Sequence, residues 1–352
     1  MARLSRRQKL GLGGGAVVLA CLALVAVLAG GGDDGTQRAQ NQKRSSRGAR
    51  GPGPVAGKNR GGGPRSAGSA KPSPGGGGAE GVPEWSVWVV TIPGGRPRVA
   101  APTPSEVPVT PAWSELKGRI AFVRPTCEDC DAAVWTSRPD GSSARKLRTR
   151  LGDQTDPAWS PSGRSLAVVR VGGGLYTVST RDGAARPLLA HSVVEDPVWS
   201  PGGGAIVFAR RQGVAGWDLY SIRPNGSGLR RLTRSRAQEL APDWSPDGKR
   251  IAFQRQEKGG AWSVYVMRAD GSNVRRLIAG TSAHSIEQPA WSPGGGTIAF
   301  VGVTLAGSRI EVVRLGSGRP PRSITGPSLQ AADPDWSPDG RRLVFSAKRA
   351  GG

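Results

Sequence analysis

Acidic residues recur shortly before a repeated tryptophan, and they are the first group in this sequence whose chemistry points to binding. Four stand close to the tryptophan and two lie nearby: Asp156, Asp196, Glu287 and Asp333, then Glu195 and Glu239. Carboxylates gathered around a narrow opening focus a negative potential, which suits a cation or a basic peptide. Alternatively, an aspartate before a proline caps a turn where the chain enters a strand. The sequence leaves both interpretations open.

Two histidines, His191 and His284, precede such a tryptophan by eight and seven residues. Each is therefore expected in the connection between two repeats, near the same channel mouth as the carboxylates. Metal-dependent lyases and hydrolases gather several histidine and carboxylate ligands in one cluster, and two histidines supply too few. The sequence also contains no Gly-x-Ser-x-Gly nucleophile motif. We therefore predict no metal, no cofactor and no catalytic residue.

Cys127 and Cys130 are separated by two residues in a predicted hairpin loop. In an exported protein, two cysteines this close are expected to form a local disulfide. A metal site would need a second pair of ligands, and the remaining cysteine, Cys21, lies far away in the sequence.

The tryptophans belong to a repeated phrase, Pro-x-Trp-Ser-Pro-x-Gly, that is followed at once by a short apolar alternation. Five copies are complete and a sixth, the first along the chain, lacks the second proline. The six tryptophans are Trp113, Trp159, Trp199, Trp244, Trp291 and Trp336, spaced 46, 40, 45, 47 and 45 residues apart. A period of about 40–50 residues, rich in short strands, is typical of a β-propeller. We interpret the tryptophans as structural side chains that pack between neighbouring repeats.

The fourth copy shows the strand pattern of one repeat. Residues 242–245, 250–255, 262–268 and 273–278 are predicted strands, joined by turns that contain Pro246, Gly248 and Gly271. Four antiparallel strands of this kind make one propeller blade.

The two ends of the repeat region are expected to share one blade. The last copy stops after residues 342–347, two strands into a blade, and residues 85–90 resemble the third strand of the other copies. Strands of about 85–100 then complete the last blade, which closes the ring and removes the exposed strand edges. The sequence thus predicts an all-β, six-bladed propeller closed by its N- and C-terminal strands.

These residues resemble the TolB-like β-propeller repeat family, whose consensus is Pro-x-Trp-Ser-Pro-Asp-Gly followed by a strand such as Lys-Ile-Ala-Phe. Residues 242–253 and 334–345 match it almost letter for letter. The resemblance covers residues 84–352 and implies the propeller fold. The family's namesake binds a peptidoglycan-associated lipoprotein through its propeller, so the resemblance also implies protein binding.

The N-terminal residues predict export. Residues 1–9 are basic and residues 10–30 are apolar, long enough at 1.5 Å per residue to reach about 30 Å across a bilayer. The basic cluster would stay in the cytoplasm and the rest of the chain would lie outside. We favour an uncleaved single-pass anchor; a cleaved signal peptide, or a lipoprotein modified at Cys21, is the alternative.

Residues 31–83 are rich in Gly, Pro, Ser and Arg and have almost nothing to bury, so this linker is predicted to be disordered. It could serve as a spacer, and its basic residues could also hold anionic lipid or a wall polymer. The whole chain carries a formal net charge of +23. Nucleic acid is not an expected partner outside the cell.

Basic residues of the propeller cluster after its two kinds of turn. The first turns precede Arg164, Lys249, Arg250, Arg341 and Arg342, and the second turns precede Arg145, Lys146, Arg230, Arg231, Arg275 and Arg276. Both turns are expected on the opposite face or the outer rim. The prediction is therefore a negative channel mouth and a positive opposite face.

Taken together, the sequence predicts a membrane-tethered, extracytoplasmic, monomeric propeller in a bacterial cell envelope. It would act as a non-catalytic scaffold that binds an envelope protein or peptide at the channel mouth. The alternatives are a glycan-active lyase or hydrolase with a site in the channel, and an architectural protein without a defined ligand.

Overall fold

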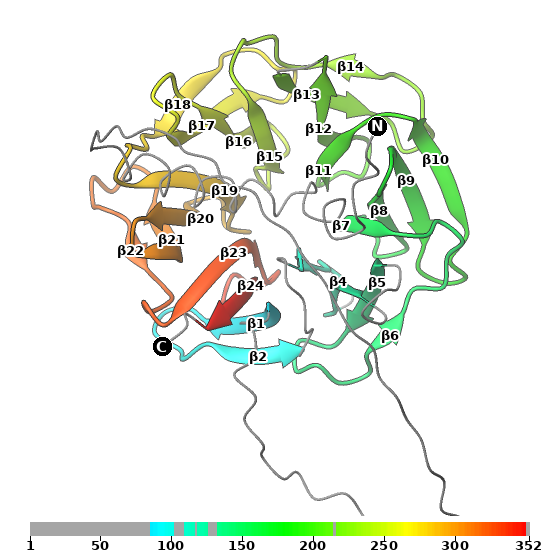
Figure 1. Cartoon of the computed structure of the whole chain (residues 1–352), viewed down its shortest axis with the longest axis horizontal. Coiled ribbons are helices and arrows are strands. Elements are labelled where there is room, and N and C mark those ends of the chain that lie inside the picture. Colours follow the sequence, from blue (N-terminus) through cyan, green and yellow to red (C-terminus); the bar gives the residue numbers. More distant parts are fainter. Residues whose placement is uncertain (1–84, 102–108, 117, 126–131, 214–215, 350–352) are drawn as a thin grey trace, which may run out of the picture.

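The computed structural model describes residues 85–101, 109–116, 118–125, 132–213 and 216–349. All regular elements in these ranges are β-strands, which form six four-stranded antiparallel sheets around a central axis (Figure 1). No helix in this described part has the length and apolar character needed to cross a membrane. The predicted segment 10–30, the predicted linker 31–83, and Cys127 and Cys130 lie outside the described residues.

The first three blades follow one another along the chain, each with its innermost strand first. Blade 1 contains β3 (Ala112–Trp113), β4 (Ile120–Pro125), β5 (Ala132–Ser137) and β6 (Arg145–Lys146). Blade 2 contains β7 (Gln154–Trp159), β8 (Ser165–Arg170), β9 (Gly174–Ser179) and β10 (Ala185–Ala190). Blade 3 contains β11 (Val194–Trp199), β12 (Ile206–Gln212), β13 (Gly216–Ile222) and β14 (Arg230–Arg231).

The next two blades repeat this order, and the last blade combines both ends of the domain. Blade 4 contains β15 (Glu239–Trp244), β16 (Arg250–Gln256), β17 (Trp262–Arg268) and β18 (Arg275–Ile278). Blade 5 contains β19 (Ser285–Trp291), β20 (Thr297–Thr304), β21 (Gly307–Arg314) and β22 (Arg322–Ser323). Blade 6 contains β23 (Leu329–Trp336), β24 (Arg342–Arg349), β1 (Ser86–Thr91) and β2 (Arg98–Ala101).

The shared blade confirms the predicted closure of the ring. Strand β1 pairs antiparallel with β24, with Trp88 opposite Phe345 and Val90 opposite Leu343. The buried indole N–H of Trp88 also donates to the backbone oxygen of Ala347 at 3.0 Å. Figure 1 shows β1 and β2 completing the sheet that β23 and β24 begin. The seam leaves no blade with only two strands, and β24 pairs on both sides, with β23 and with β1.

Apolar alternation in the second strand of each blade builds the core. Five blades place a fully buried phenylalanine at the same position: Phe122, Phe208, Phe253, Phe300 and Phe345. Blade 2 has Val168 at this position, also fully buried. Because neighbouring side chains of a strand point to opposite faces, each sheet contributes to two layers of the core. Val169 and Leu175 of blade 2, for example, share a cluster with Ile206 and Phe208 of blade 3.

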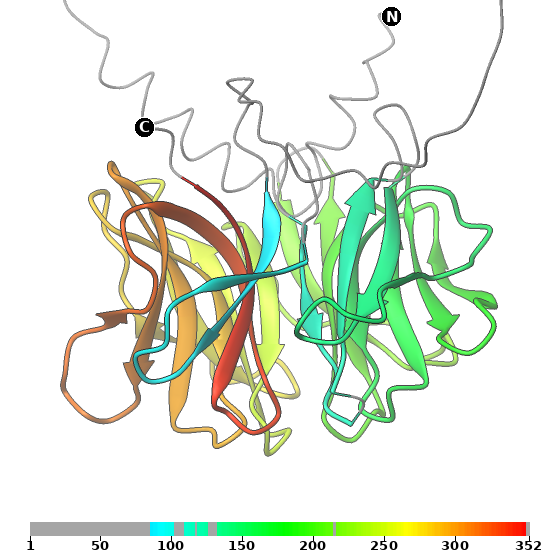
Figure 2. The same ribbon diagram turned by 90° about the horizontal axis from the view of Figure 1, so that it is seen from below.

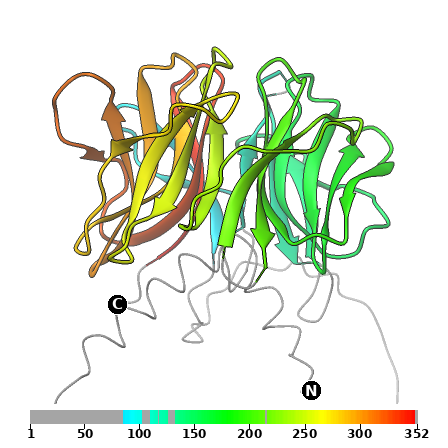
Figure 3. The ribbon, with the colours of Figure 1, turned by 90° about the horizontal axis from the view of Figure 1, so that it is seen from above.

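The strands run between two faces of the molecule, as the side views in Figures 2 and 3 show. We call them the turn face and the connection face. The turn face carries the Pro-x-Gly turns that follow each innermost strand, for example residues 246–248. The connection face carries the segments that lead from one blade to the next, for example residues 191–193.

Candidate functional site

A central cavity of about 530 Å³ lies on the axis of the propeller, among the innermost strands of all six blades. Each blade contributes the same four positions, which begin at the residue before the first proline and end at the repeat tryptophan. They are residues 110–113, 156–159, 196–199, 241–244, 288–291 and 333–336. The lining continues to Pro201, Pro246, Pro293 and Pro338, so it extends to the turn face.

The residue before the first proline has an unusual backbone in every blade. The φ angles are 37° at Thr110, 48° at Asp156, 52° at Asp196, 48° at Ala241, 48° at Gln288 and 52° at Asp333. Positive φ is costly for residues other than glycine. Its recurrence at the same position of all six blades shows that this conformation is a regular part of the fold. A β-bulge accompanies it: the register of β15 with β16, for instance, shifts between Leu240 and Asp243.

The bulge turns a backbone N–H away from its own sheet, and a side chain of the preceding blade accepts it. Asp196 Oδ2 accepts the N–H of Ala241 at 2.9 Å, and Gln288 Oε1 accepts that of Asp333 at 2.9 Å. Ala241 has no acceptor to offer, and Gln254 Oε1 takes the N–H of Gln288 at 2.7 Å instead. We call these six positions, with their side chains, the inter-blade belt. Asp196 therefore joins blades 3 and 4, which differs from both alternatives that the sequence left open, a turn cap and a ligand-binding carboxylate.

Two further aspartates, which the sequence analysis missed, line the cavity nearer the turn face. Asp243 Oδ2 accepts the backbone N–H of Trp291 at 2.6 Å, and Asp335 Oδ2 accepts that of Trp113 at 2.5 Å. They stand between proline and tryptophan, where the other blades have alanine or valine. Comparing the six copies at that position would have revealed both. Glu115 also lines the cavity, because it replaces the second proline in the incomplete first copy.

Burial raises the pKa of every carboxyl in this region. The pKa of Asp156 rises to about 8 through burial and the nearby charges of Asp196 and Asp333. Burial raises the pKa of Asp196 to about 6, although the N–H of Ala241 opposes the shift. For Asp243, Asp333 and Asp335, burial raises the pKa to about 7. Asp156 is buried, whereas the other four are half-buried. The carboxyls of the cavity therefore lose their protons at higher pH than exposed aspartates do.

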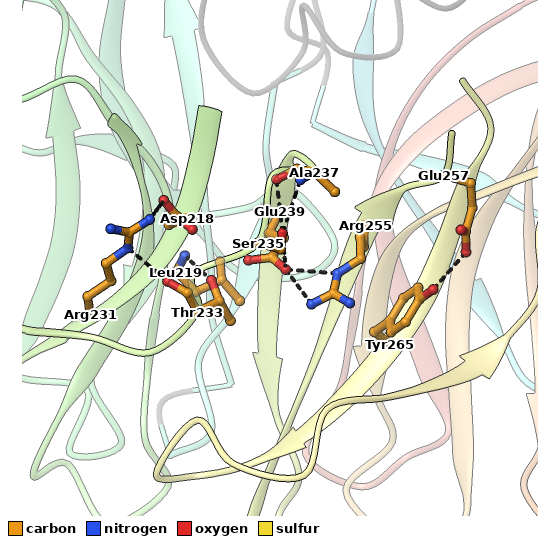
Figure 4. Close-up of polar contacts among 10 residues, drawn as sticks. All are labelled: Asp218, Leu219, Arg231, Thr233, Ser235, Ala237, Glu239, Arg255, Glu257 and Tyr265. Carbon is orange, nitrogen blue, oxygen red and sulfur yellow. Dashed lines mark hydrogen bonds and ion pairs between the residues drawn. The ribbon is translucent and has the colours of Figure 1, made fainter. Parts of the chain in front are cut away.

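The glutamates predicted at the channel mouth are not among the cavity-lining residues. Glu239 is fully buried and accepts hydrogen bonds from Arg255 Nε at 2.8 Å and from Ser235 Oγ at 2.9 Å (Figure 4). Glu287 is also fully buried, and its carboxylate accepts a hydrogen bond from Ser285 Oγ at 3.0 Å. Glu195 is buried next to Asp196, and burial followed by the charge of Asp196 raises its pKa to about 9.

The histidines lie apart from the cavity. His191 is exposed on the connection face, and neither histidine is among the cavity-lining residues. His284 Nε2 lies 3.3 Å from Glu311 Oε2, within blade 5. The prediction that histidines and carboxylates share one mouth is therefore wrong: the aspartates lie within the inner strands rather than in the connecting loops. Among the described residues, no three His, Cys, Asp or Glu side chains come together as a metal site.

The separation of charge between the two faces stays a prediction, but two of the basic residues lie beside the cavity. The guanidinium of Arg250 lies 4.9 Å from the ring centre of Trp291, and that of Arg342 lies 4.9 Å from the ring centre of Trp113. Both tryptophans line the cavity, so basic and acidic groups meet at the turn face. The reason is that the first turn joins the innermost strand directly, which places the following residues around the axis.

The repeat tryptophans contact neighbouring blades and line the cavity at the same time. The indole N–H of Trp159 donates to the backbone oxygen of Ala112 at 3.2 Å, and that of Trp336 donates to Ala290 at 3.1 Å. Trp291 and Trp113 lie instead under the two arginines of the preceding blade. These contacts join four of the six blade pairs.

Fold and site together define a six-bladed β-propeller whose central cavity is lined by carboxylates and indoles. No family model matches the chain, and no curated protein matches it. Its structure is similar to that of a protein assigned as a TolB from Agrobacterium tumefaciens, with 21% identity and a TM-score of 0.65 over 77% of this chain and 100% of that one.

Two other solved structures are also similar. TolB from Acinetobacter baumannii has 16% identity and a TM-score of 0.54, over 76% of this chain and 64% of that chain. A propeller in a nidogen/laminin complex has 9% identity and a TM-score of 0.55, over 74% of this chain and 98% of that chain. At these identities the likeness shows the fold alone.

Proposed function

We propose that this protein is a non-catalytic binding propeller that receives a cationic segment of a partner protein in its central cavity. The observation that carries the proposal is the gathering of Asp156, Asp196, Asp243, Asp333 and Asp335 in one cavity of about 530 Å³. Cavities of this size, apolar with a few convergent polar groups, are typical ligand sites. The likeness to two TolB propellers supports a protein-binding scaffold.

The wall of the cavity suits a peptide better than a bare ion. The six repeat tryptophans and the prolines beside them supply apolar surface for side-chain stems. Indole faces also attract cationic groups. A cation that enters would favour the ionised carboxylates, so binding is expected to release protons to solvent.

We further propose that the propeller is exported and held near a bacterial membrane by residues 10–30, with residues 31–83 as its tether. The partner would then be an envelope protein. The basic residues of the tether would lie near anionic lipid or wall polymer.

A substitution that fills the cavity tests the proposal. Ala158 lines the cavity, so Ala158→Arg would add both bulk and a positive charge to it. Ala184 is exposed in an outer turn, and Ala184→Arg is the matched control. Full-length protein would be used to capture partners from an envelope extract, with thermal melting as the check on folding. We expect Ala158→Arg to lose the partners that the wild type and the control retain. Equal capture by all three proteins would refute the cavity as the binding site.

A further inference from the structure

Two oxygens of the inter-blade belt, in blades 1 and 2, lack hydrogen-bond partners. Elsewhere its side chains are occupied: Asp196 binds the N–H of Ala241, and Gln288 and Asp333 bind each other. Thr110 Oγ1 and Asp156 Oδ1 are buried oxygens without a hydrogen-bond partner. A buried polar atom without a partner costs about 1–3 kcal/mol, so its persistence calls for an explanation.

The residues that carry both unpartnered oxygens line the cavity, and the oxygens themselves are covered from solvent. Thr110 and Asp156 line the cavity, and the Asp156 residue is only 6% exposed. They occupy the same belt position in adjacent blades. Gln288 and Asp333, at that position in blades 5 and 6, are close enough to form a hydrogen bond of 2.5 Å between their side chains. Thr110 and Asp156, at the same position of blades 1 and 2, are neighbours around the axis in the same way.

The geometry of Asp156 selects the kind of donor. Its carboxyl accepts the hydroxyl of Thr155, at 3.2 Å from Oδ2, and the backbone N–H of Asp196, while Oδ1 has no hydrogen-bond partner. A planar guanidinium prefers two parallel bonds to one carboxylate, whereas an ammonium donates three bonds in separate directions. A hydroxyl and one carboxylate oxygen on different strands match the ammonium. A metal ion would need more ligands, and the described residues offer no cluster of three.

The wall that leads to these oxygens is apolar. Between proline and tryptophan, blades 1 and 2 have Ala112 and Ala158, where blades 4 and 6 have Asp243 and Asp335. The two positions are two residues apart along the strand, which advances about 6.6 Å. A lysine stem of four methylenes is of similar length and packs readily along apolar surface.

We propose that the primary ammonium of a partner's lysine side chain binds between Thr110 Oγ1 and Asp156 Oδ1, with its stem along Ala112 and Ala158. This subsite rests on the proposed function, since it names the side chain that the cavity recognises. It also explains why these two oxygens of the belt lack partners: the ligand supplies the missing donor.

Peptides with a single variable side chain test the subsite. Acetylated and amidated nonapeptides of Gly and Ser, with central Lys, Arg, norleucine or Nε-acetyllysine, would be titrated into the full-length protein by calorimetry. We expect the Lys peptide to bind about tenfold or more tightly than the norleucine and acetyllysine peptides, and tighter than the Arg peptide. Thr110→Val and Asp156→Asn should each weaken Lys binding about tenfold. Asp270→Asn, an exposed change of the same charge, should leave it unchanged.

Other outcomes would overturn the subsite. Equal binding of the Lys and Arg peptides would exclude a site selective for a compact donor. Binding of 1,5-diaminopentane as tight as that of the Lys peptide would point to a free diamine rather than a protein side chain. Competition by calcium chloride that disappears in Asp156→Asn would point to a metal.

The subsite and the proposed function can fail separately. If Ala158→Arg abolishes partner capture while Thr110→Val and Asp156→Asn do not, the cavity binds the partner but the lysine subsite is wrong. If Ala158→Arg leaves capture intact, the proposed function is wrong, whatever the peptides show.

Discussion

Replacing Asp156 by asparagine should stabilise the protein at alkaline pH, although it removes a charged group. In the folded protein, burial and the charges of Asp196 and Asp333 raise the pKa of Asp156 from 3.8 to about 8. Between these values the unfolded chain has lost its proton while the folded chain keeps it. Because the unfolded state then binds fewer protons, the free energy of unfolding falls as pH rises from about 4 to about 8.

The magnitude follows from the size of the shift. One pKa unit corresponds to about 1.4 kcal/mol, so a shift from 3.8 to about 8 sets an upper limit of roughly 6 kcal/mol above pH 8. Relaxation around the ionised group and shared protons with Asp196 and Asp333 reduce this, and we expect about 1–3 kcal/mol. Asparagine keeps an oxygen that accepts the hydroxyl of Thr155 and has nothing to ionise.

Urea unfolding of the full-length protein at pH 5, 6, 7 and 8 measures this effect. We expect the wild type to lose stability across this range and Asp156→Asn to lose less, so that the variant is the more stable protein at pH 8. Some dependence on pH should remain, because the pKa values of Asp243 and Asp335 are raised to about 7. Asp270→Asn should follow the wild type, because hydrogen bonds from Ser272 lower the pKa of Asp270, which keeps it ionised throughout. A wild type whose stability rises from pH 5 to pH 8 would refute the reasoning.

Two further substitutions test the closure of the ring and a buried ion pair. Phe345→Ala, in the blade that joins both chain ends, should lower the free energy of unfolding by about 3–5 kcal/mol. Leu305→Ala, at an 81% exposed side chain, is the control and should change it little. A loss below 1 kcal/mol for Phe345→Ala would contradict the packing of that blade. Glu239→Gln should cost about 3 kcal/mol, because it leaves the charge of Arg255 without its partner, and combining Glu239→Leu with Arg255→Met should recover most of the loss. Urea unfolding measures the effect of both substitutions. A double variant that is less stable than Glu239→Gln alone would show that the ion pair itself stabilises the fold.

The repeat phrase was enough to predict the fold because its residues determine the local backbone conformation. Proline and glycine mark the turn after each innermost strand, and the apolar alternation behind them builds the second strand. The closing blade followed from counting strands: the last copy ends two strands into a blade, and residues 85–90 resemble the missing third strand. The pairing of Val90 with Leu343 bears this out. The turn residues and the apolar alternation predict little in a single copy, but six copies that share one geometry make the prediction strong.

The site was harder to predict because a single bulge decides which way each side chain points. In blade 4, Glu239 pairs with Arg255 and Asp243 pairs with Ala252. Arg255 and Ala252 are three residues apart on one strand, so they point to opposite faces of the sheet. The bulge therefore sends Glu239 into the packed interior and leaves Asp243 at the cavity. Glu239 and Asp243 lie close together in the sequence, which gives no reason to place them differently. Only the strand register shows that their side chains point to different sides.

In a repeat protein, the positions that depart from the consensus carry more information about function than the positions that keep it. In the belt, Asp196 binds the N–H of Ala241 and Gln288 binds Asp333, and because Ala241 has no acceptor in its side chain, Gln254 binds the N–H of Gln288 instead. In blades 1 and 2, Thr110 Oγ1 and Asp156 Oδ1 stay unpartnered. Thr110 directly precedes the most divergent copy of the repeat, in which Glu115 replaces a proline at the cavity wall. The unpartnered oxygens and the divergent copy thus lie on the same side of the axis, where the proposed lysine side chain would bind.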